Sequence, residues 1–218
     1  MQMTGYDLTL SGARLTALGS GALYWPEQNV LCVSDLHLGK SERHARRGGT
    51  TLPPYETQDT LTRLDADLNQ TQASTVICLG DSFDDDTAAR DLPQAEKDQI
   101  VELASSNRWI WIAGNHDPAP QDLPGEQHDS LPLASLTFRH IAEPDTTGEV
   151  SGHFHPKAKL RGATRPAFLL DQSRLILPAY GTYTGGLRST DTTLTSLMAP
   201  KAIAILTGPR PLAIPMPR

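Results

Sequence analysis

Hydrophobic and polar residues alternate in short runs near the start of the chain. Residues 6–25 follow this alternation, and Gly12, Gly19 and Gly21 interrupt it. Alternation with a period of two, broken by glycine turns, predicts antiparallel strands at the edge of a sheet. The run Val30–Val33 is apolar throughout, which indicates a central strand with both faces buried.

The following segments alternate between helical and extended patterns. Leu61, Leu64 and Leu68 recur at helical spacing, and Pro53 and Pro54 precede them, where proline suits a helix start. Two further apolar runs have the pattern of buried strands, and a second helical segment separates them. The predicted elements are a helix within 55–70, a strand within 74–81, a helix within 91–107 and a strand within 108–117.

The rest of the chain predicts a loop and then consecutive strands. Residues 118–133 are rich in proline and polar residues, which favours an irregular loop beside the site. Strands alternating with helices, followed by strands alone, predict an α/β fold in which helices flank a two-sheet β-sandwich. The later strands are expected within 133–140, 148–156, 173–186 and 202–215.

The composition is that of an ordinary globular protein. Hydrophobic residues make up 38% and charged residues 20% of the 218 residues, so one domain spanning 1–218 is expected. No run approaches the roughly 20 apolar residues of a membrane span, and the first residues lack the features of a signal peptide. We therefore expect a cytoplasmic protein without a membrane segment.

The cysteines and tryptophans are interpreted as core residues. Cys32 and Cys78 each lie inside an apolar run, which favours reduced, buried thiols over a disulfide. Trp25, Trp109 and Trp111 also lie in strand segments, where packing in the core is a commoner role than stacking on a ligand.

Side chains able to bind metals follow three of the predicted strands. Asp35 and His37 follow the first, Asp81 follows the second, and Asn115 and His116 follow the third. At a spacing of i, i+2, an extended chain would point Asp35 and His37 in the same direction. Sites in α/β sheets gather at the carboxyl ends of strands, so these groups are expected to meet.

Histidines also end the later strands. His140 closes one apolar run, and His153 and His155 repeat the i, i+2 spacing after another. A single histidine is more often a surface or core residue than a ligand. Five of the seven histidines lie at strand ends, however, and only His44 and His128 lie elsewhere; we interpret His128 as a loop residue. This concentration predicts a metal site.

The ordered blocks DLH, GDSFDD, GNHD, a single histidine and GHFH resemble the signature of the calcineurin-like metallophosphoesterase superfamily. The resemblance covers most of the chain and implies a metallophosphoesterase-type α/β/β/α sandwich. The segments GKSERHARRGG, PPYET, GHFHPKA and LPAYGTYTGGL further resemble the bacterial ligase-associated DNA damage response endonuclease family, PdeM.

The superfamily resemblance also implies two divalent metal ions. Mixed oxygen and nitrogen donors fit manganese, iron or zinc, and the closer resemblance favours manganese. Asn115 would supply a neutral amide oxygen, which binds a hard cation without repelling an anionic substrate. The implied ligands are Asp35, His37, Asp81 and His155 for one metal and Asp81, Asn115, His140 and His153 for the other, with Asp81 as the bridge.

These ligands predict the hydrolysis of a phosphate ester. Two carboxylates facing two dications leave a charge of about +2, which suits a phosphate ester and a metal-activated hydroxide. His116, which the superfamily does not use as a ligand, is the candidate general acid. Asp84 could orient His116, although a solvated acidic turn at 84–86 is an alternative.

A first basic cluster follows the first ligands. The net charge of −6 argues against a broadly basic surface, but a local cluster can still bind phosphates. The alternative is an ordinary charged helix start or loop. The candidate residues for binding phosphates that flank the scissile one are Lys40, Arg43, Arg46 and Arg47.

A second basic cluster follows His155, and it favours a polyanionic substrate. In the segment 181–189, Tyr183 and Arg188 are able to touch a base or a phosphate, although a plain hairpin turn is the simpler interpretation. The second cluster consists of Lys157, Lys159, Arg161 and Arg165.

The leading hypothesis is a metal-dependent phosphodiesterase, specifically a DNA endonuclease in DNA repair. DNA as substrate, and a DNA ligase or helicase as partner, follow from the family resemblance alone. One alternative is a small-molecule phosphoesterase or a nucleotide or sugar-nucleotide pyrophosphatase of the same superfamily. Another is a non-catalytic scaffold, which could lose ligands freely, whereas this chain keeps all seven candidates and His116.

Overall fold

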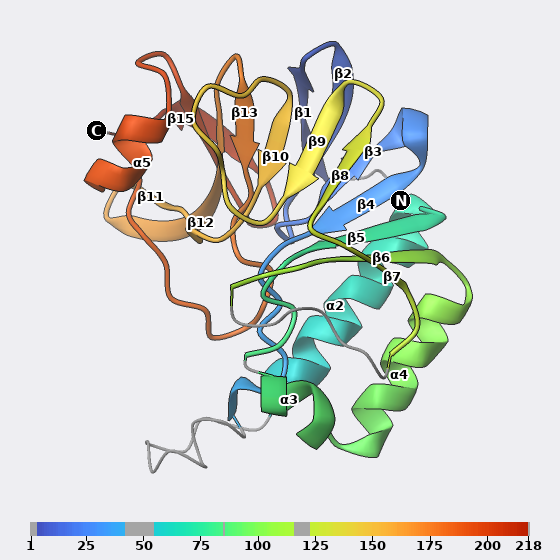
Figure 1. Ribbon diagram of the computed structural model, residues 1–218. Coiled ribbons are helices and arrows are strands. Elements are labelled where there is room, and N and C mark those ends of the chain that lie inside the picture. The colour runs from blue at the N-terminus through green and yellow to red at the C-terminus, as the bar shows by residue number, and fades with distance from the viewer. Residues whose placement is uncertain (1–3, 42–54, 85, 116–122, 218) are drawn as a thin grey trace.

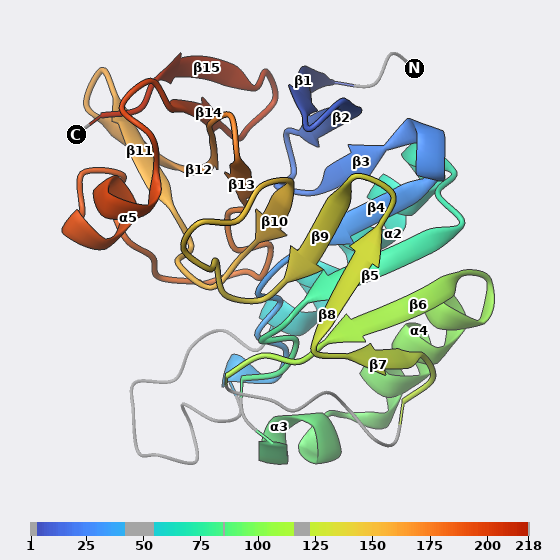
Figure 2. The same ribbon diagram turned by 45° about the horizontal axis from the view of Figure 1, so that its top comes forward.

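The computed structural model describes residues 4–41, 55–84, 86–115 and 123–217. Two β-sheets face each other in it, and helices lie against their outer faces (Figure 1). This arrangement confirms the predicted α/β/β/α sandwich. The second view shows the edges of the two sheets and the helices outside them (Figure 2).

The first sheet has seven strands among the described residues, in the order β1-β2-β3-β4-β5-β6-β7. Strands β1 to β4 pair antiparallel, and β4 to β7 pair parallel. The predicted edge strands and the central strand are therefore confirmed. The strands are β1 (Gly5–Leu10), β2 (Ala13–Leu18), β3 (Leu23–Trp25), β4 (Val30–Val33), β5 (Thr75–Leu79), β6 (Arg108–Ile112) and β7 (Glu126–His128), and the 3-10 helix η1 (Pro26–Gln28) joins β3 to β4.

The second sheet has the order β15-β14-β12-β13-β10-β9-β8, with β11 paired to β12. Strand β10 pairs parallel with both β9 and β13, so these three strands end on the same side. The strands are β8 (Ser130–Leu133), β9 (Leu136–Arg139), β10 (Glu149–Ser151), β11 (Lys157–Leu160), β12 (Ala163–Leu170), β13 (Arg174–Ile176), β14 (Ile203–Leu206) and β15 (Leu212–Pro215).

Helices cover the two outer faces unequally. Helices α2 (Glu56–Thr71) and α4 (Gln94–Ser105) lie on the first sheet, where Leu61 and Leu64 of α2 are fully buried. The short helix α5 (Thr192–Leu197) lies on the second sheet, and α3 (Asp86–Asp91) follows β5. Within the described ranges, no helix combines the length and the apolar character that crossing a membrane requires.

Strand alternation divides the apolar residues between two cores. Cys32 and Ile77 point between the sheets and pack with Phe138 of the second sheet. Their chain neighbours Leu31 and Cys78 point the other way, toward the helices. Because both faces are covered, β4 is apolar at every position, and β5 and β6 are apolar after their first residues, Thr75 and Arg108. Both cysteines are free and buried, as predicted, and burial raises the pKa of Cys32.

The predicted loop at 118–133 is wrong in its second half. Strands β7 and β8 lie there, and His128 belongs to β7 rather than to a loop. Both are edge strands held by backbone pairing to β6 and β9, so β7 tolerates polar side chains and β8 tolerates Pro132. Leu131 and Leu133 alternate in β8, but two residues are too few to mark a strand. The part of the prediction at 118–122 lies outside the described residues. The hairpin of β11 and β12 was not predicted.

Candidate metal centre

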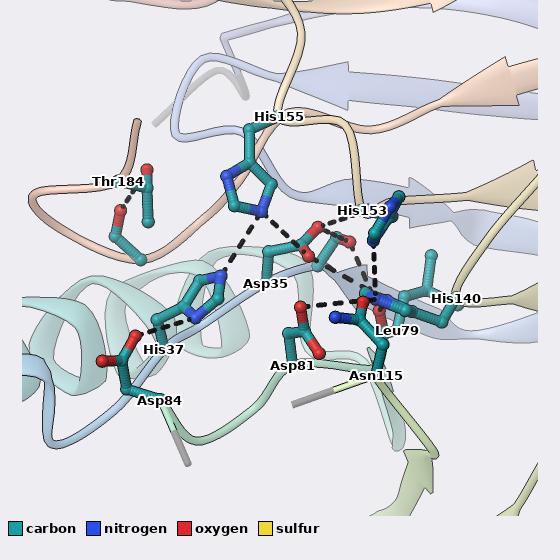
Figure 3. A network of polar contacts seen from close by, with 12 residues as sticks. Asp35, His37, Leu79, Asp81, Asp84, Asn115, His140, His153, His155 and Thr184 are labelled. Carbon is teal, nitrogen blue, oxygen red and sulfur yellow. Dashed lines mark hydrogen bonds and ion pairs between the residues drawn. The ribbon is translucent and has the colours of Figure 1, made fainter. Parts of the chain in front are cut away.

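Side chains from both sheets meet where their strands end (Figure 3). The first sheet supplies the groups that follow β4, β5 and β6, and the second sheet supplies those that follow β9 and β10. The structure thus brings together all seven predicted ligands, which are Asp35, His37, Asp81 and Asn115 from the first sheet and His140, His153 and His155 from the second.

A first cluster contains Asp35, His37 and His155, whose ligand atoms all lie within 4.8 Å of one another. The Nε2 atom of His155 lies 3.1 Å from Asp35 Oδ1 and 3.3 Å from His37 Nε2. Asp35 is fully buried and His37 nearly so. Three donor groups therefore face one small volume with little access to water.

A second cluster contains Asp81, His140 and His153, again within 4.8 Å. The Nε2 atom of His140 lies 3.4 Å from Asp81 Oδ2 and 3.3 Å from His153 Nδ1. The amide oxygen of Asn115, an exposed residue, lies 2.9 Å from the same nitrogen. The two clusters match the two predicted ligand sets, but only the second contains Asp81, so its role as a bridge stays a prediction.

The backbone of these residues differs from the extended chain that the i, i+2 spacing predicted. Asp35, His37, Asp81, His153 and His155 all have positive φ, between 45° and 69°. Such left-handed residues are uncommon outside glycine, and they concentrate at functional sites where the surrounding structure holds them. The extended backbone is therefore wrong, because the chain turns at each strand end. Asp35 and His37 nevertheless share a cluster, and His153 and His155 enter different clusters, as the family resemblance implied.

Asp35 is held as an anion. Its Oδ2 atom accepts hydrogen bonds from the Ser34 hydroxyl at 2.5 Å and from the His153 backbone N–H at 2.9 Å. Burial by itself raises the pKa of Asp35, but the hydrogen bond and charge of His155, the charge of His140 and the Ser34 hydroxyl outweigh it and lower the pKa. Oδ1 remains directed at His155.

Two glycines make room for these groups. A Cβ atom on Gly152 would lie 1.7 Å from Ser34 Oγ and 2.5 Å from Asp35 Oδ2. A Cβ atom on Gly80, where φ is +68°, would lie 2.4 Å from His140 Nδ1. The sequence blocks GHFH and LGD contain both residues, but only the packing shows that neither position can carry a side chain.

The ring of His37 is oriented by a buried carboxylate. Its Nδ1 atom lies 3.2 Å from Asp84 Oδ1, and Asp84 is 3% exposed. A carboxylate accepts hydrogen bonds, so Nδ1 carries the proton and the lone pair of Nε2 points into the first cluster, as a metal ligand requires. The alternative of a solvated acidic turn is therefore wrong for Asp84.

His140 is oriented by the backbone. Its Nδ1 atom lies 2.9 Å from the carbonyl oxygen of Leu79, so Nδ1 donates and the lone pair of Nε2 faces outward. The lone pair of Nε2 faces the side-chain oxygens of Asn115 and Asp81, and these oxygens are also hydrogen-bond acceptors. Three acceptors around one point repel each other unless a cation or a proton lies between them, so the donor set fits a divalent metal ion.

The pKa values in the second cluster agree with this interpretation. Burial lowers the pKa of His140, but the hydrogen bond to Asp81, the charges of Asp35 and Asp81 and the carbonyl of Leu79 outweigh it, and the pKa is raised. Burial and the charge of His140 lower the pKa of His153. The surroundings of His140 therefore favour a positive charge at this position, which a bound cation would also supply.

The first basic cluster is described only at its start. Lys40 is half-buried, and the residues on either side of it are anchored to α2: the Ser41 backbone N–H donates to Glu56 Oε1 at 2.8 Å, and the Gly39 N–H donates to Thr57 Oγ1 at 3.0 Å. Glu56 and Thr57 end the PPYET segment and begin α2, so this segment ties the start of the basic cluster to the helix. Outside the described residues lie Arg43, Arg46, Arg47 and His116.

Comparisons with known proteins define the class. The family model described as calcineurin-like phosphoesterase matches residues 28–191. The chain therefore belongs to the calcineurin-like phosphoesterase family, as its sequence blocks predicted, and it is a phosphoester hydrolase. The family implies a dinuclear centre of divalent metals, and the two donor clusters provide a site for each ion.

Two solved structures resemble this chain. A nuclease of Pseudomonas putida, MPE, is 30% identical, with a TM-score of 0.75 over 95% of this chain and 100% of that chain. The phosphoesterase Yfce from E. coli is 13% identical, with a TM-score of 0.43 over 86% of this chain and 99% of that chain. No curated protein sequence matches the chain.

Proposed function

We propose that this protein is a metal-dependent phosphodiesterase that cleaves DNA. The observation that carries the proposal is the pair of adjacent donor clusters at the ends of the two sheets, in a chain whose family hydrolyses phosphate esters. The likeness to a nuclease over nearly the full length of both chains supports a nucleic acid as substrate.

Each donor cluster would hold one divalent cation. When bound, the two cations supply Lewis acidity toward the phosphate oxygens and activate the attacking water. The mixed carboxylate, amide and imidazole donors suit manganese, which we propose, while iron and zinc are the alternatives. The proposed ligands are Asp35, His37 and His155 for one ion and Asp81, Asn115, His140 and His153 for the other, with Asp81 as the bridge.

The surrounding residues prepare this site before substrate arrives. Ser34 and the His153 backbone N–H hold Asp35 in one orientation. Asp84 fixes the tautomer of His37, so we propose Asp84 as a positioning residue for His37. The role of Asp84 toward His116 stays a prediction. Preorganisation of this kind means that the ligands need not rearrange when the substrate phosphate binds.

Protonation of the leaving oxygen is assigned to His116. It directly follows Asn115, whose amide oxygen contacts the second cluster, so a short chain connection links it to the centre. An imidazole with a pKa near neutrality suits a general acid. To bind the phosphates flanking the scissile one, we propose the basic residues Lys40, Arg43, Arg46 and Arg47.

The finer biological assignments stay predictions. A role in DNA repair and a DNA ligase or helicase partner rest on the sequence resemblance alone, and a cytoplasmic location stays an expectation from the sequence. The principal alternative activity is hydrolysis of a small phosphate ester by the same centre, because the donor clusters alone do not select the size of the substrate.

The test is an assay of metal-reconstituted protein on single-stranded and duplex DNA, on bis-(p-nitrophenyl) phosphate and on the p-nitrophenyl monoester. We expect hydrolysis of DNA and of the diester. Turnover of the monoester alone would refute the phosphodiesterase proposal and favour a small-molecule phosphatase.

The general acid is tested separately with His116→Ala. This variant should lose activity on DNA, whose leaving alkoxide needs a proton, by roughly 10²- to 10⁴-fold. It should keep most activity on bis-(p-nitrophenyl) phosphate, whose leaving phenolate does not need one. Equal losses on both substrates would assign His116 to binding rather than to proton transfer.

A further inference from the structure

The segment after β13 packs directly on the first donor cluster. The backbone N–H of Tyr180 donates to the Ser34 carbonyl at 2.7 Å, and that of Gly181 donates to the Asp35 carbonyl at 3.1 Å. Gly186 of the same segment also approaches the cluster, since a Cβ atom there would lie 2.0 Å from the His155 carbonyl oxygen. The plain hairpin turn considered for this region is therefore wrong, because the segment forms a wall of the metal centre.

Strand β11 leads away from this wall and presents cations on one face. Lys157 Nζ donates to the Thr184 carbonyl at 3.0 Å, and Lys157 forms a parallel bridge with Arg188. Residues paired in a bridge point to the same face of a sheet, and Lys159, two residues after Lys157 in the strand, points to that face too. Ala158, between the two lysines, is fully buried in the opposite direction. Lys157, Lys159 and Arg188 therefore line one side of β11, starting beside the first cluster.

The charge of this region opposes that of the rest of the protein. Residues 150–190 contain six lysine and arginine residues and one acidic residue, Asp171, a net formal charge of +5. One of the six cations, Arg174, is buried against Glu149 and adds nothing to the surface. Because the whole chain carries −6, the remainder carries −11. A basic strip on an acidic protein attracts a polyanion to one place and repels it from others.

A groove of about 570 Å³ lies next to the start of the strip. It is lined in part by Thr184 and by Pro166, which is the cross-strand partner of Lys157. Tyr183 also lines it and is 45% exposed. Arg63 of α2 also lines it, donates to the Tyr180 carbonyl at 2.8 Å and lies 3.8 Å from Asp59, and the buried Asp67 lines the groove as well. The groove thus combines an accessible aromatic ring with a guanidinium group held in place.

We propose that the strip of Lys157, Lys159 and Arg188, with the groove at Tyr183, is the track for a single nucleic-acid strand on one side of the scissile phosphate. The proposal rests on the proposed nuclease function and names the part of the surface that recognises the polymer. Cations spaced along a strand match successive phosphates, and an exposed aromatic ring beside them offers a stacking surface for a base.

The strip is tested with the double variant Lys159→Gln/Arg188→Gln. Lys157 is left intact because it supports the Thr184 backbone. A control, Arg14→Gln/Lys97→Gln, makes the same change of net charge on elements outside 150–190. For holoenzyme, kcat/KM is measured on a single-stranded oligonucleotide and on bis-(p-nitrophenyl) phosphate at several salt concentrations. Binding of the labelled oligonucleotide is measured by anisotropy in the presence of a chelator.

The strip variant should lose affinity for the oligonucleotide and keep its activity on the small diester. The slope of log K against log salt should shrink by about 0.7 for each phosphate that the variant no longer neutralises, and the control should leave the slope unchanged. Tyr183→Ala should weaken binding by roughly 5- to 150-fold without changing the slope, and Tyr183→Phe should restore it.

Two failures can be told apart. If the wild-type protein hydrolyses the small diester but neither binds nor cleaves the oligonucleotide, the nuclease proposal fails and the track fails with it. If the wild type cleaves the oligonucleotide and the strip variant matches the control in both affinity and salt slope, the track alone is overturned. Equal loss on both substrates would also overturn it, because it would indicate damage to the metal centre.

Discussion

The two donor clusters are built alike but supported differently. Each takes a carboxylate from the first sheet and at least one histidine from the second, so neither is complete until the sheets pack together. In the first cluster the carboxylate of Asp84 orients His37, whereas in the second the carbonyl of Leu79 orients His140. A mutation can therefore remove the group that orients His37, which is a side chain, but not the group that orients His140, which is a backbone carbonyl. The difference makes the clusters separately testable.

The largest effect is expected from Asp35→Asn. This change keeps the size of the side chain but removes the buried carboxylate that the first cluster contributes. Even outer partners of metal ligands contribute 10- to 100-fold, so we expect hydrolysis to fall by more than about 100-fold. Elemental analysis should show one metal per chain instead of two. Asp98→Asn, an exposed carboxylate on α4, is the control. If the Asp35→Asn variant still bound two metals and kept full activity, Asp35 would not be a metal ligand.

A smaller effect is expected from Asp84→Asn. Loss of the carboxylate frees the tautomer of His37, and metal affinity at the first cluster should fall by roughly 10- to 100-fold, measured by titration with a competing chelator. In a His37→Ala background the same change should have little further effect, because the two residues act as one unit. If the losses of metal affinity in the two single variants simply add in the double variant, Asp84 acts on another residue than His37, for example on His116.

Metal addition should stabilise the fold because each cluster joins the two sheets. At a free metal concentration of 100 times Kd, one site contributes about 2.7 kcal/mol to the free energy of unfolding. For a chain of this size that corresponds to a rise in Tm of roughly 5–10 °C over the chelated protein. Differential scanning calorimetry measures it. A Tm that is the same with metal and with chelator would contradict binding at the junction of the sheets.

The smallest effect is a pH dependence from the second cluster. The pKa of His140 is raised in the metal-free fold, so its proton stabilises that fold below the ordinary pKa of 6.5, and this stability is lost as pH rises through the folded pKa. A metal ion can bind His140 only after this proton has left the ring nitrogen. Affinity at this cluster should therefore rise with pH, by up to about tenfold per unit below the folded pKa. Metal titration from pH 6 to 8 would show it, and an affinity that falls with pH would contradict the assignment.

Much of the fold was predictable because its central strands are buried on both faces. The apolar run at Val30–Val33 and the helical spacing of Leu61 and Leu64 lie where the pattern placed them. The prediction failed for β7 and β8, since edge strands depend on backbone pairing: β7 is polar throughout, and β8 has only Leu131 and Leu133 on its half-buried side. The left-handed conformation of Asp35 and its counterparts was not predictable either, because it results from the turns at the strand ends.

The sequence by itself determined the chemistry of the donors and their order along the chain. Carboxylate, amide and imidazole groups at the ends of successive strands identify a metal site, because strand ends are where polar groups can meet above a buried sheet. The residues alone did not decide how these groups divide between two clusters; the family resemblance implied the division, and the tertiary structure produces it. That division depends on the packing of one sheet against the other, which brings His155 to Asp35 and His140 to Asp81 across long stretches of chain.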